Sequence, residues 1–160
     1  MNKYILSIIF LMLIISCNSE SPKEIPNEVI VIVELIKNKE KSQEELKEFT
    51  KRYSNYVKST EPNTLGWTYH DAGDKIILIE RYKDEDANIV TAKNISPGGN
   101  RYKLLQESFK YHTLAKVTVI GGFTEKLIDF NKITAEKVGF TAPFIYYPLI
   151  SGYSKNLIGK

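Results

Sequence analysis

The stretch Glu61–Ala87, EPNTLGWTYHDAGDKIILIERYKDEDA, decides the fold that we expect for this chain. Its first half predicts a strand, because Leu65, Trp67 and Tyr69 recur with the period of two that places them on one face. The segment Asp71–Asp74, DAGD, then supplies the Asp and Gly that a short hairpin loop needs for a positive φ. The middle of the stretch therefore predicts a β-hairpin.

A second strand and the start of a helix follow this turn. Ile76–Ile79 is a continuous apolar run of strand length. Asp84 can cap a helix, and Glu85 and Asp86 would then lie in its first turn, where the helix dipole favours negative charge. The stretch thus predicts strand, turn, strand and helix in that order.

Two short patterns in this stretch carry a resemblance. They are Pro-x-x-Leu-Gly-Trp at residues 62–67 and Ile-Glu-x-Tyr-x-Asp-Glu-x-Ala at residues 79–87. Through them the chain resembles the antibiotic biosynthesis monooxygenase-like family, roughly from Glu28 to Ile120. The resemblance implies an α+β fold: a ferredoxin-like βαββαβ domain with an antiparallel sheet, two copies of which form a dimeric α+β barrel. It also implies a homodimer and a pocket between sheet and helices.

The first 16 residues look like a bacterial lipoprotein signal peptide. Lys3 is followed by the apolar run Ile5–Ile15, which is too short for a membrane-spanning helix of about 20 residues. Ile14-Ile15-Ser16-Cys17 then resembles a lipobox. We expect residues 1–16 to be removed, Cys17 to carry the lipid and residues 17–27 to be a tether. The alternative is a small N-terminal membrane anchor with a chance cysteine.

This interpretation implies a lipoprotein of a bacterial cell envelope, extracytoplasmic and anchored to a membrane by its N-terminal lipid. Cys17 is the only cysteine, so no other thiol remains for a disulfide or a thiolate metal site. The chain has 22 Lys and Arg against 19 Asp and Glu and no basic patch interleaved with aromatics, so we expect no nucleic-acid partner. By length, the roughly 130 residues after the tether predict one domain. The resemblance assigns residues 28–123 to the ferredoxin-like part, and a C-terminal helix and aromatic arm at 124–160 then pack on the domain or on a partner.

The helices outside the hairpin have clear signals. Ser42–Glu45, SQEE, is a capping box, and the helix after it runs to about Lys58 with a buried apolar stripe. A second helix after Asp84 is expected to turn Ala87 and Val90 inward and to end at residues 96–100. Further helices are predicted at 102–111, presenting Phe109, and after Thr124, with an inward set of Leu127, Ile128, Phe130 and Ile133.

Two more strands complete the predicted sheet. Glu28–Ile36 is apolar on both faces until Glu34, and Leu114–Ile120 is the fourth strand. The tail Phe140–Tyr153 is too rich in aromatics to be disordered by composition, so it packs on its own domain or crosses to a partner. Pro148–Lys155 is similar to a segment that ends some relatives.

The candidate site residues lie around the hairpin. The resemblance places a small aromatic ligand beside aromatic walls, for which the candidates are Trp67, Tyr69, Tyr82 and Phe109, with Glu80, Glu34 and the two histidines as polar groups. His70 and His112 are the catalytic candidates, because neutral histidine accepts a proton near neutral pH, whereas a carboxylate does so only when burial raises its pKa. The alternatives are a core Trp67, an exposed His70 and a His112 that caps its helix.

Two functions of different classes follow. The first is a cofactor-independent oxygenase of a small aromatic or quinol-like compound, and the second is a non-catalytic ligand-binding or interaction module. We expect no cofactor, and no metal site, since His70 and His112 lie far apart in the sequence without a third ligand. Relatives often carry a histidine in the helix after residue 84, and here Thr91 occupies that place.

Overall fold

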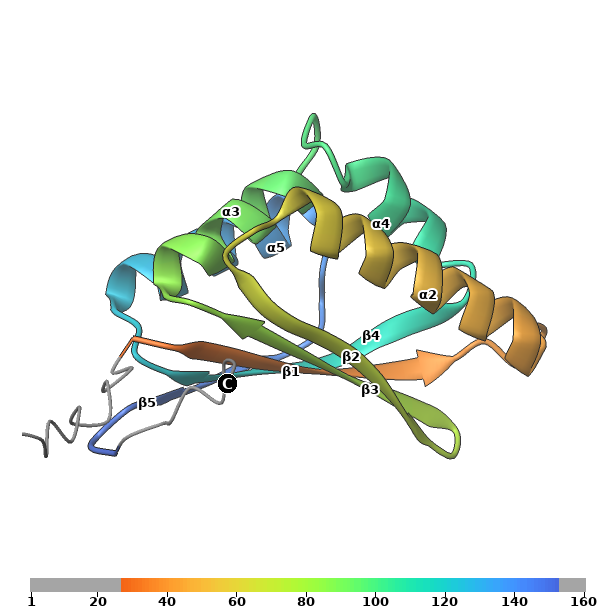
Figure 1. The fold of residues 1–160 in the computed structure, drawn as a ribbon, viewed down its shortest axis with the longest axis horizontal. Helices are drawn as coiled ribbons and strands as arrows, with labels where there is room; N and C mark the ends of the chain where they lie inside the picture. The colour runs from red at the N-terminus through yellow and green to blue at the C-terminus, as the bar shows by residue number, and fades with distance from the viewer. Residues whose placement is uncertain (1–26, 153–160) are drawn as a thin grey trace, which may run out of the picture. The chain divides into compact units, whose positions relative to one another are not determined.

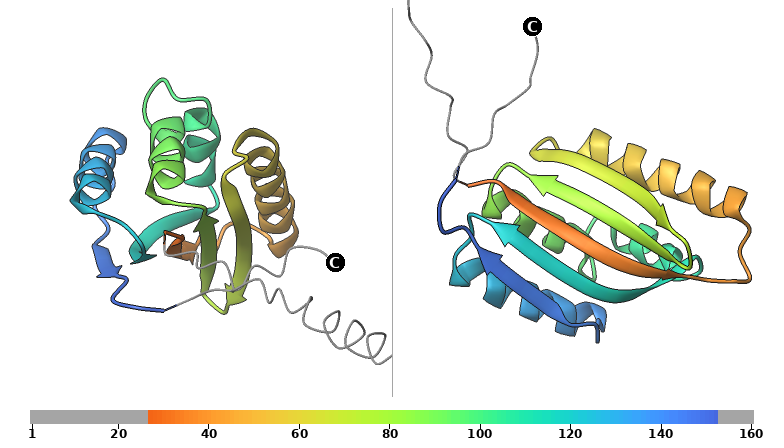
Figure 2. Two further views of the ribbon diagram at one scale, coloured as in Figure 1. Left: turned by 60° about the vertical axis from the view of Figure 1, so that its left-hand side comes forward. Right: turned by 90° about the horizontal axis from the view of Figure 1, so that it is seen from below.

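A computed structural model describes residues 27–152, and the predicted signal peptide, tether and lipidated Cys17 lie outside the described residues. The fold is α+β, as predicted. A five-stranded sheet has the order β2-β3-β1-β4-β5, antiparallel except for the pair β4–β5. The helices lie together on one face of this sheet (Figures 1 and 2). The elements are β1 (Val29–Lys37), α2 (Gln43–Thr60), β2 (Thr64–Ala72), β3 (Lys75–Tyr82), α3 (Glu85–Ile95), α4 (Tyr102–Ser108), β4 (His112–Gly121), α5 (Glu125–Val138) and β5 (Phe144–Pro148).

The predicted hairpin is formed by β2 and β3. Gly73 adopts φ 77° in its turn, a conformation that L side chains rarely adopt. Trp67 pairs with Glu80 and Tyr69 with Leu78, so these four residues share the helix-covered face. Leu65 differs from its prediction, because a bulge between Thr64 and Gly66 shifts the register and leaves Leu65 42% exposed.

Helix α2 begins and packs as predicted. The side chain of Ser42 accepts a hydrogen bond from the backbone N–H of Glu45, and the Glu45 carboxylate accepts one from the Ser42 N–H, which completes the capping box. Its buried stripe faces the sheet and consists of Leu46, Phe49, Tyr53 and Val57. This stripe supplies one wall of the site described below.

The later helices correct several details. Asp84 caps α3 as predicted, but Val90 and Ile133 are each 48% exposed. The inward positions are taken by other residues, namely Ala87, Asn88, Ile89, Thr91 and Ala92 in α3 and Leu127, Asn131 and Thr134 in α5. Helix α4 ends at Ser108 instead of residue 111, so His112 begins strand β4 and does not cap a helix.

The C-terminal segment completes the sheet at one edge. Helix α5 ends at Gly139, and the chain then returns as β5, which pairs in parallel with β4. Phe144 and Tyr146 pack against the core on the helix-covered side. Among residues 27–152, no helix is long and apolar enough to span a membrane.

The two faces of the sheet differ in what covers them. On the helix side lie Val29, Val31, Val33 and Leu35 of β1, each less than 10% exposed. Seen from the opposite side, the sheet lies in front of the helices (Figure 2). We call this second side the open face; its isoleucines from β1 and β3 are half-buried, and they are Ile30, Ile32, Ile77 and Ile79. The helix-covered face therefore holds the core and the site.

Candidate functional site

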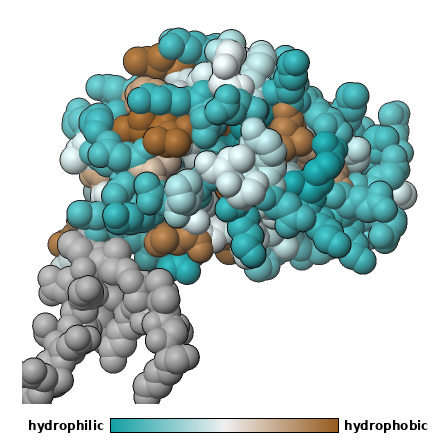
Figure 3. All heavy atoms as spheres, turned by 45° about the horizontal axis from the view of Figure 1, so that its top comes forward, coloured by the Kyte–Doolittle hydropathy of each residue, from teal (hydrophilic) through white to brown (hydrophobic). Residues whose placement is uncertain are grey.

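A cavity of about 120 Å³ lies between the helix-covered face of the sheet and the helices. We call it the site cavity. Apolar side chains from β1, β3 and β4 form its floor, and α2, α3, α4 and α5 contribute its walls. An engineered apolar cavity of about 150 Å³ is known to bind benzene, so this space has the scale of a single aromatic ring. From the helix side the molecule is mainly hydrophilic on its surface, with separate hydrophobic patches (Figure 3).

Aromatic rings line one side of the cavity. The Tyr53 and Trp67 rings stack with centroids 5.6 Å apart and an interplanar angle of 16°. Tyr53 comes from the buried stripe of α2 and Trp67 from the inward alternation of β2, so both positions follow from the periodicity of their elements. Burial raises the pKa of Tyr53 to about 12 and that of Tyr69 well above its usual value, so both phenols stay neutral at neutral pH.

Arg101 lies against these rings and is the largest fully buried side chain, 1% exposed. Its guanidinium carbon is 4.9 Å from the Trp67 ring centroid and 5.5 Å from that of Tyr53. Such cation–π contacts are worth about 2 kcal/mol or more when desolvated. The side chain also lines the site cavity. A permanent positive charge is thus held at the cavity wall, because arginine does not deprotonate in proteins.

The contact between Arg101 and Glu61 is an ion pair without a hydrogen bond. Arg101 Nη1 lies 3.2 Å from Glu61 Oε1, but the contact lacks hydrogen-bonding geometry. All three guanidinium nitrogens of Arg101 are buried, and none has an acceptor within residues 27–152. Buried charged donors are nearly always hydrogen-bonded, so this group is an exception within the described fold.

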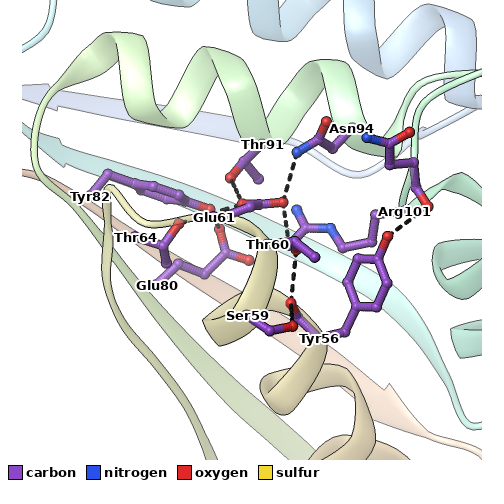
Figure 4. Close-up of polar contacts among 11 residues, drawn as sticks. Tyr56, Ser59, Thr60, Glu61, Thr64, Glu80, Tyr82, Thr91, Asn94 and Arg101 are labelled. Carbon is purple, nitrogen blue, oxygen red and sulfur yellow. Dashed lines mark hydrogen bonds and ion pairs between the residues drawn. The ribbon is translucent and has the colours of Figure 1, made fainter.

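Glu61 is held by other donors (Figure 4). Its Oε2 accepts hydrogen bonds from the hydroxyls of Thr91 and Thr64, and its Oε1 accepts one from Asn94 Nδ2 at 3.0 Å. Glu61 also ends α2, where its backbone N–H donates to the carbonyl of Val57. The Glu61 carboxylate is therefore fixed between the C-terminal end of α2 and the C-terminal half of α3.

A glycine-dependent loop brings Arg101 to this place. The backbone N–H of Arg101 donates to the Asn94 carbonyl at 2.9 Å, so the loop folds back onto the end of α3. A Cβ atom on Gly99 would lie 2.3 Å from the carbonyl oxygen of Lys93, closer than any real contact. Only glycine permits this approach, and the approach aims Arg101 inward.

Glu80 is the second carboxyl group at the cavity. It lies on β3 opposite Trp67 and is 8% exposed. Burial raises the pKa of Glu80 to about 7, against smaller lowering effects of the Tyr82 hydrogen bond and the Arg101 charge. The Tyr82 hydroxyl donates to Glu80 Oε2 at 2.6 Å. Glu80 can therefore exchange a proton at neutral pH.

His112 faces the cavity from the start of β4. It is 6% exposed, and neither ring nitrogen has a partner among the described residues. Burial lowers the pKa of His112 to about 4, so its ring is neutral at pH 7. Its ring lies edge-on to Phe49 at 6.3 Å, beside the Phe49–Tyr111 stack. His112 is a neutral polar group in an aromatic surrounding.

The structure gathers most of the predicted site residues and separates two of them. Five line the cavity: Trp67, Tyr69, Glu80, Phe109 and His112. Tyr82 is wholly buried and does not line the cavity, and its hydroxyl donates a hydrogen bond to Glu80. His70 is exposed on the open face, where it contacts Thr68, because it is one residue out of step with Tyr69. Glu34 also points to the open face, where it pairs with Lys75 and Lys116.

Sequence reasoning missed the residues around Arg101. In the sequence, Glu61 and Arg101 stand 40 positions apart in segments that read as loops, and charged residues in loops are usually solvated. Thr91 was noted only as a departure from relatives, yet its hydroxyl fixes Glu61. The one available signal was the pair Gly98-Gly99 before Arg101, which indicates close backbone packing but not its direction. Of the described residues, no three His, Cys, Asp or Glu form a metal-binding group.

Comparisons with known proteins show the fold. No protein-family model matches the sequence, and no significant match to a curated protein is found. The crystal structure of MupZ from Pseudomonas fluorescens aligns with a TM-score of 0.62 and 15% identity, over 84% of this chain and 99% of MupZ. This likeness shows that the two chains share a fold.

Two other solved structures align at lower scores. SnoaB from Streptomyces nogalater, described as a cofactor-independent oxygenase, matches with a TM-score of 0.48 and 15% identity over 61% of this chain and 92% of SnoaB. A proposed antibiotic biosynthesis monooxygenase from Bacteriodes thetaiotaomicron matches with a TM-score of 0.45 and 17% identity, over 62% of this chain and 91% of that protein. The structural neighbours thus include proteins described as oxygenases or monooxygenases.

Proposed function

We propose that this protein binds a small, planar, largely apolar molecule in the site cavity and acts on it as a cofactor-independent oxygenase. One observation carries the proposal. Glu80 is a carboxyl group buried at the cavity wall opposite Trp67, and burial raises its pKa to about 7. A general base works best when its pKa lies near the operating pH, so Glu80 has the acidity that proton abstraction at neutral pH requires.

The proposed reaction uses the substrate, dioxygen and Glu80 as the base. An electron-rich aromatic with an acidic CH₂ group would give a proton to Glu80, and the resulting carbanion would reduce dioxygen. One oxygen atom stays on the carbon as a carbonyl and the other leaves as water, so CH₂ plus O₂ gives C=O plus H₂O. The protein's part is to exclude water, to stack the ring beside Trp67 and to hold the proton on Glu80.

Oxygen uptake tests this function. The full chain is incubated in an oxygen electrode with a panel of hydroxylated aromatic ketones that carry an acidic CH₂ group, and with quinols. We expect turnover with at least one compound and a loss of about 100-fold or more in the Glu80→Gln variant, the usual range for removal of a general base. Lys132→Ala is the control, because Lys132 is exposed on α5, outside the cavity lining and the open face, and should leave turnover unchanged. The absence of oxygen uptake with every compound would refute the oxygenase.

The second candidate is a non-catalytic ligand-binding module that uses the same cavity. One observation favours it: Thr91 stands where relatives carry a histidine, and its hydroxyl is occupied by Glu61. A threonine with its proton committed to a carboxylate performs no acid–base step. Ligand binding measured by Trp67 fluorescence, without oxygen uptake, is the result expected for this function.

We further propose that two copies associate through their open faces and that the mature chain is lipidated on Cys17. The half-buried isoleucines of β1 and β3 form an apolar strip on this face, which a second copy would cover. Light scattering on the chain from Ser21 onward should give twice the monomer mass.

Cys17→Ser should abolish labelling by a clickable fatty acid, and equal labelling of the mutant would contradict the lipoprotein.

A further inference from the structure

We propose that Arg101 is an oxyanion anchor, and that the ligand of the site cavity is a planar organic acid with two oxygens at one end, a carboxylate or the enolate of a hydroxy-carbonyl. The inference rests on the proposed function insofar as that function places a ligand in the cavity. It adds the chemical class of that ligand and a residue that recognises it. Nothing in the oxygenase chemistry itself requires a buried arginine.

The first argument is the unused donor capacity of the guanidinium. Nε, Nη1 and Nη2 of Arg101 are all buried and without an acceptor in residues 27–152. Leaving buried donors unpaired costs about 1–3 kcal/mol each, and more for charged groups. Trp67 Nε1 is a further orphaned donor at the same wall. The wall therefore lacks acceptors, which a ligand with two oxygens would supply.

The second argument is that Glu61 does not consume these donors. Its oxygens already accept from two hydroxyls and from Asn94 Nδ2, and its contact with Arg101 lacks hydrogen-bonding geometry. Glu61 thus neutralises the guanidinium at 3.2 Å and positions it, while the N–H groups stay free. In a salt bridge with a purely structural role, the arginine would instead donate two parallel hydrogen bonds to the carboxylate.

The third argument concerns shape. The guanidinium carbon lies 4.9 Å from the Trp67 ring centroid and 5.5 Å from that of Tyr53, so the rings hold the fork beside an aromatic wall. A flat carboxylate or enolate pairs with such a fork through two parallel bonds. The rest of the cavity is largely apolar, formed by residues such as Val33, Val117 and Phe144. A free phosphate would leave this apolar part unfilled, whereas an aromatic acid fills it.

The fourth argument is the balance of charge. Arg101 and Glu61 cancel, so Glu80 decides whether the site carries one negative charge. A bound oxyanion beside a protonated Glu80 leaves the same net charge as an empty site with Glu80 ionised. When Glu80 takes up a proton as the ligand binds, the cavity accepts one acid group without adding to its buried charge. Proton exchange between ligand and Glu80 is the link to the proposed base chemistry.

The experiment compares two ligands of equal shape. Benzoate and benzamide differ in charge and in one donor group, and each has the single ring that the cavity volume admits. Their affinities for the full chain are measured by titration calorimetry at about pH 6, where benzoate is ionised and Glu80 is mostly protonated. We expect benzoate to bind at least tenfold more tightly than benzamide.

Variants then assign the preference to Arg101. Arg101→Lys keeps the positive charge but loses the two parallel donors of the guanidinium, and should reduce the preference for benzoate over benzamide several-fold. The pair Arg101→Met with Glu61→Gln removes both charges and should abolish it while benzamide binding persists, which also shows that the pocket is folded. Replacing a buried ion pair by uncharged groups is often neutral for stability.

The outcomes separate this inference from the proposed function. Equal binding of benzoate and benzamide by the unmodified protein would overturn the oxyanion anchor and leave a ligand pocket intact. A preference for benzoate that survives in the doubly substituted protein would also overturn it. Binding of neither compound would refute the pocket, and the anchor with it.

Discussion

Two carboxyl groups on neighbouring strands of one sheet behave in opposite ways. Glu80 on β3 faces the helices, and burial raises its pKa to about 7. Glu34 on β1 faces the open side, where hydrogen bonds from Lys116 and Lys75 lower its pKa. Side chains along both strands alternate regularly between the two faces of the sheet, so the opposite pKa shifts arise from the face on which each carboxyl group lies.

The two faces of the sheet give their carboxyl groups different surroundings and therefore different acidities. On the helix-covered face a carboxyl group loses its water and gains only one hydrogen bond, from Tyr82, so its charged form is disfavoured. On the open face a carboxylate keeps water and two lysine partners, so its charged form is favoured. The carboxyl group on the helix-covered face can therefore exchange a proton near neutral pH, whereas the carboxylate on the open face stays charged and forms ion pairs. Four predictions test this contrast.

The largest effect is expected from breaking the buried ion pair. Glu61→Ala removes the carboxylate that balances Arg101 and leaves a buried guanidinium without a counter-charge, which costs about 3–5 kcal/mol. Glu34→Ala on the open face removes two partly solvated ion pairs, with Lys75 and Lys116, and should cost about 0–1 kcal/mol for each pair. Urea unfolding at pH 7 measures both free energies. Equal losses would show that the two faces do not differ as described.

The open face is tested next by placing a charge on it. Ile79→Glu would put an unpaired carboxylate in the proposed contact between two copies, which costs about 2–5 kcal/mol in such interfaces. Light scattering should then give the monomer mass at concentrations where the unmodified chain is a dimer. Lys132→Glu, an exposed change on α5, is the control and should leave the mass unchanged. A dimer that survives Ile79→Glu would place the contact elsewhere.

A smaller effect is expected in the pH dependence of stability. The pKa of Glu80 rises from 4.5 in the unfolded chain to about 7 in the fold, so the folded form loses stability through this group as the pH rises from 4.5 to 7. Glu80→Gln removes that loss, and the variant should gain on the order of 2 kcal/mol relative to the unmodified protein across this interval.

Using the difference between the two proteins cancels the contribution of His112. Burial lowers the pKa of His112 to about 4, so its contribution is present above pH 6.5 and is lost as the pH falls through 4, in the opposite sense. Urea unfolding at a series of pH values gives both curves. Parallel curves would mean that Glu80 ionises normally in the folded protein.

The smallest effect concerns ligand stacking. Trp67→Phe should weaken the binding of an aromatic ligand by about 1 kcal/mol, typical of an aromatic pair. Thr68→Ala, one residue along on the open face, should leave the affinity unchanged. Calorimetry measures both, and in the unmodified protein the ligand should also quench Trp67 fluorescence. Equal weakening in both variants would remove the cavity as the binding place.

Much of the fold could be predicted because its signals are local. The capping box at Ser42, the cap at Asp84 and the DAGD turn each depend on a few adjacent residues, and the structure confirms all three. The misplaced residues were those whose burial depends on distant neighbours. Val90 and Ile133 are exposed because neighbouring residues such as Ile89 and Thr134 occupy the inward positions of α3 and α5, and no local pattern decides that choice.

The candidate site divides in the same way. Alternation along β2 predicted an inward Trp67, and the condition attached to Glu80, that burial must raise its pKa, is met in the fold. The same alternation put His70 on the other face, where it cannot share a cavity with Trp67. Arg101 was missed because the loop before it packs onto α3 through backbone contacts, and such contacts leave little trace in side-chain patterns.

By itself, the sequence determined the hairpin, the helix starts and the aromatic residues available for a wall, while the α+β class was implied by the family resemblance. These depend on periodicity and on contacts within a few residues, which the order of amino acids records directly. Only the tertiary structure decided the pairing of β5 with β4, the burial of Arg101 beside Glu61 and the acidity of Glu80. Each of these depends on segments far apart in the chain, because desolvation and charge act through space and are set only when those segments meet.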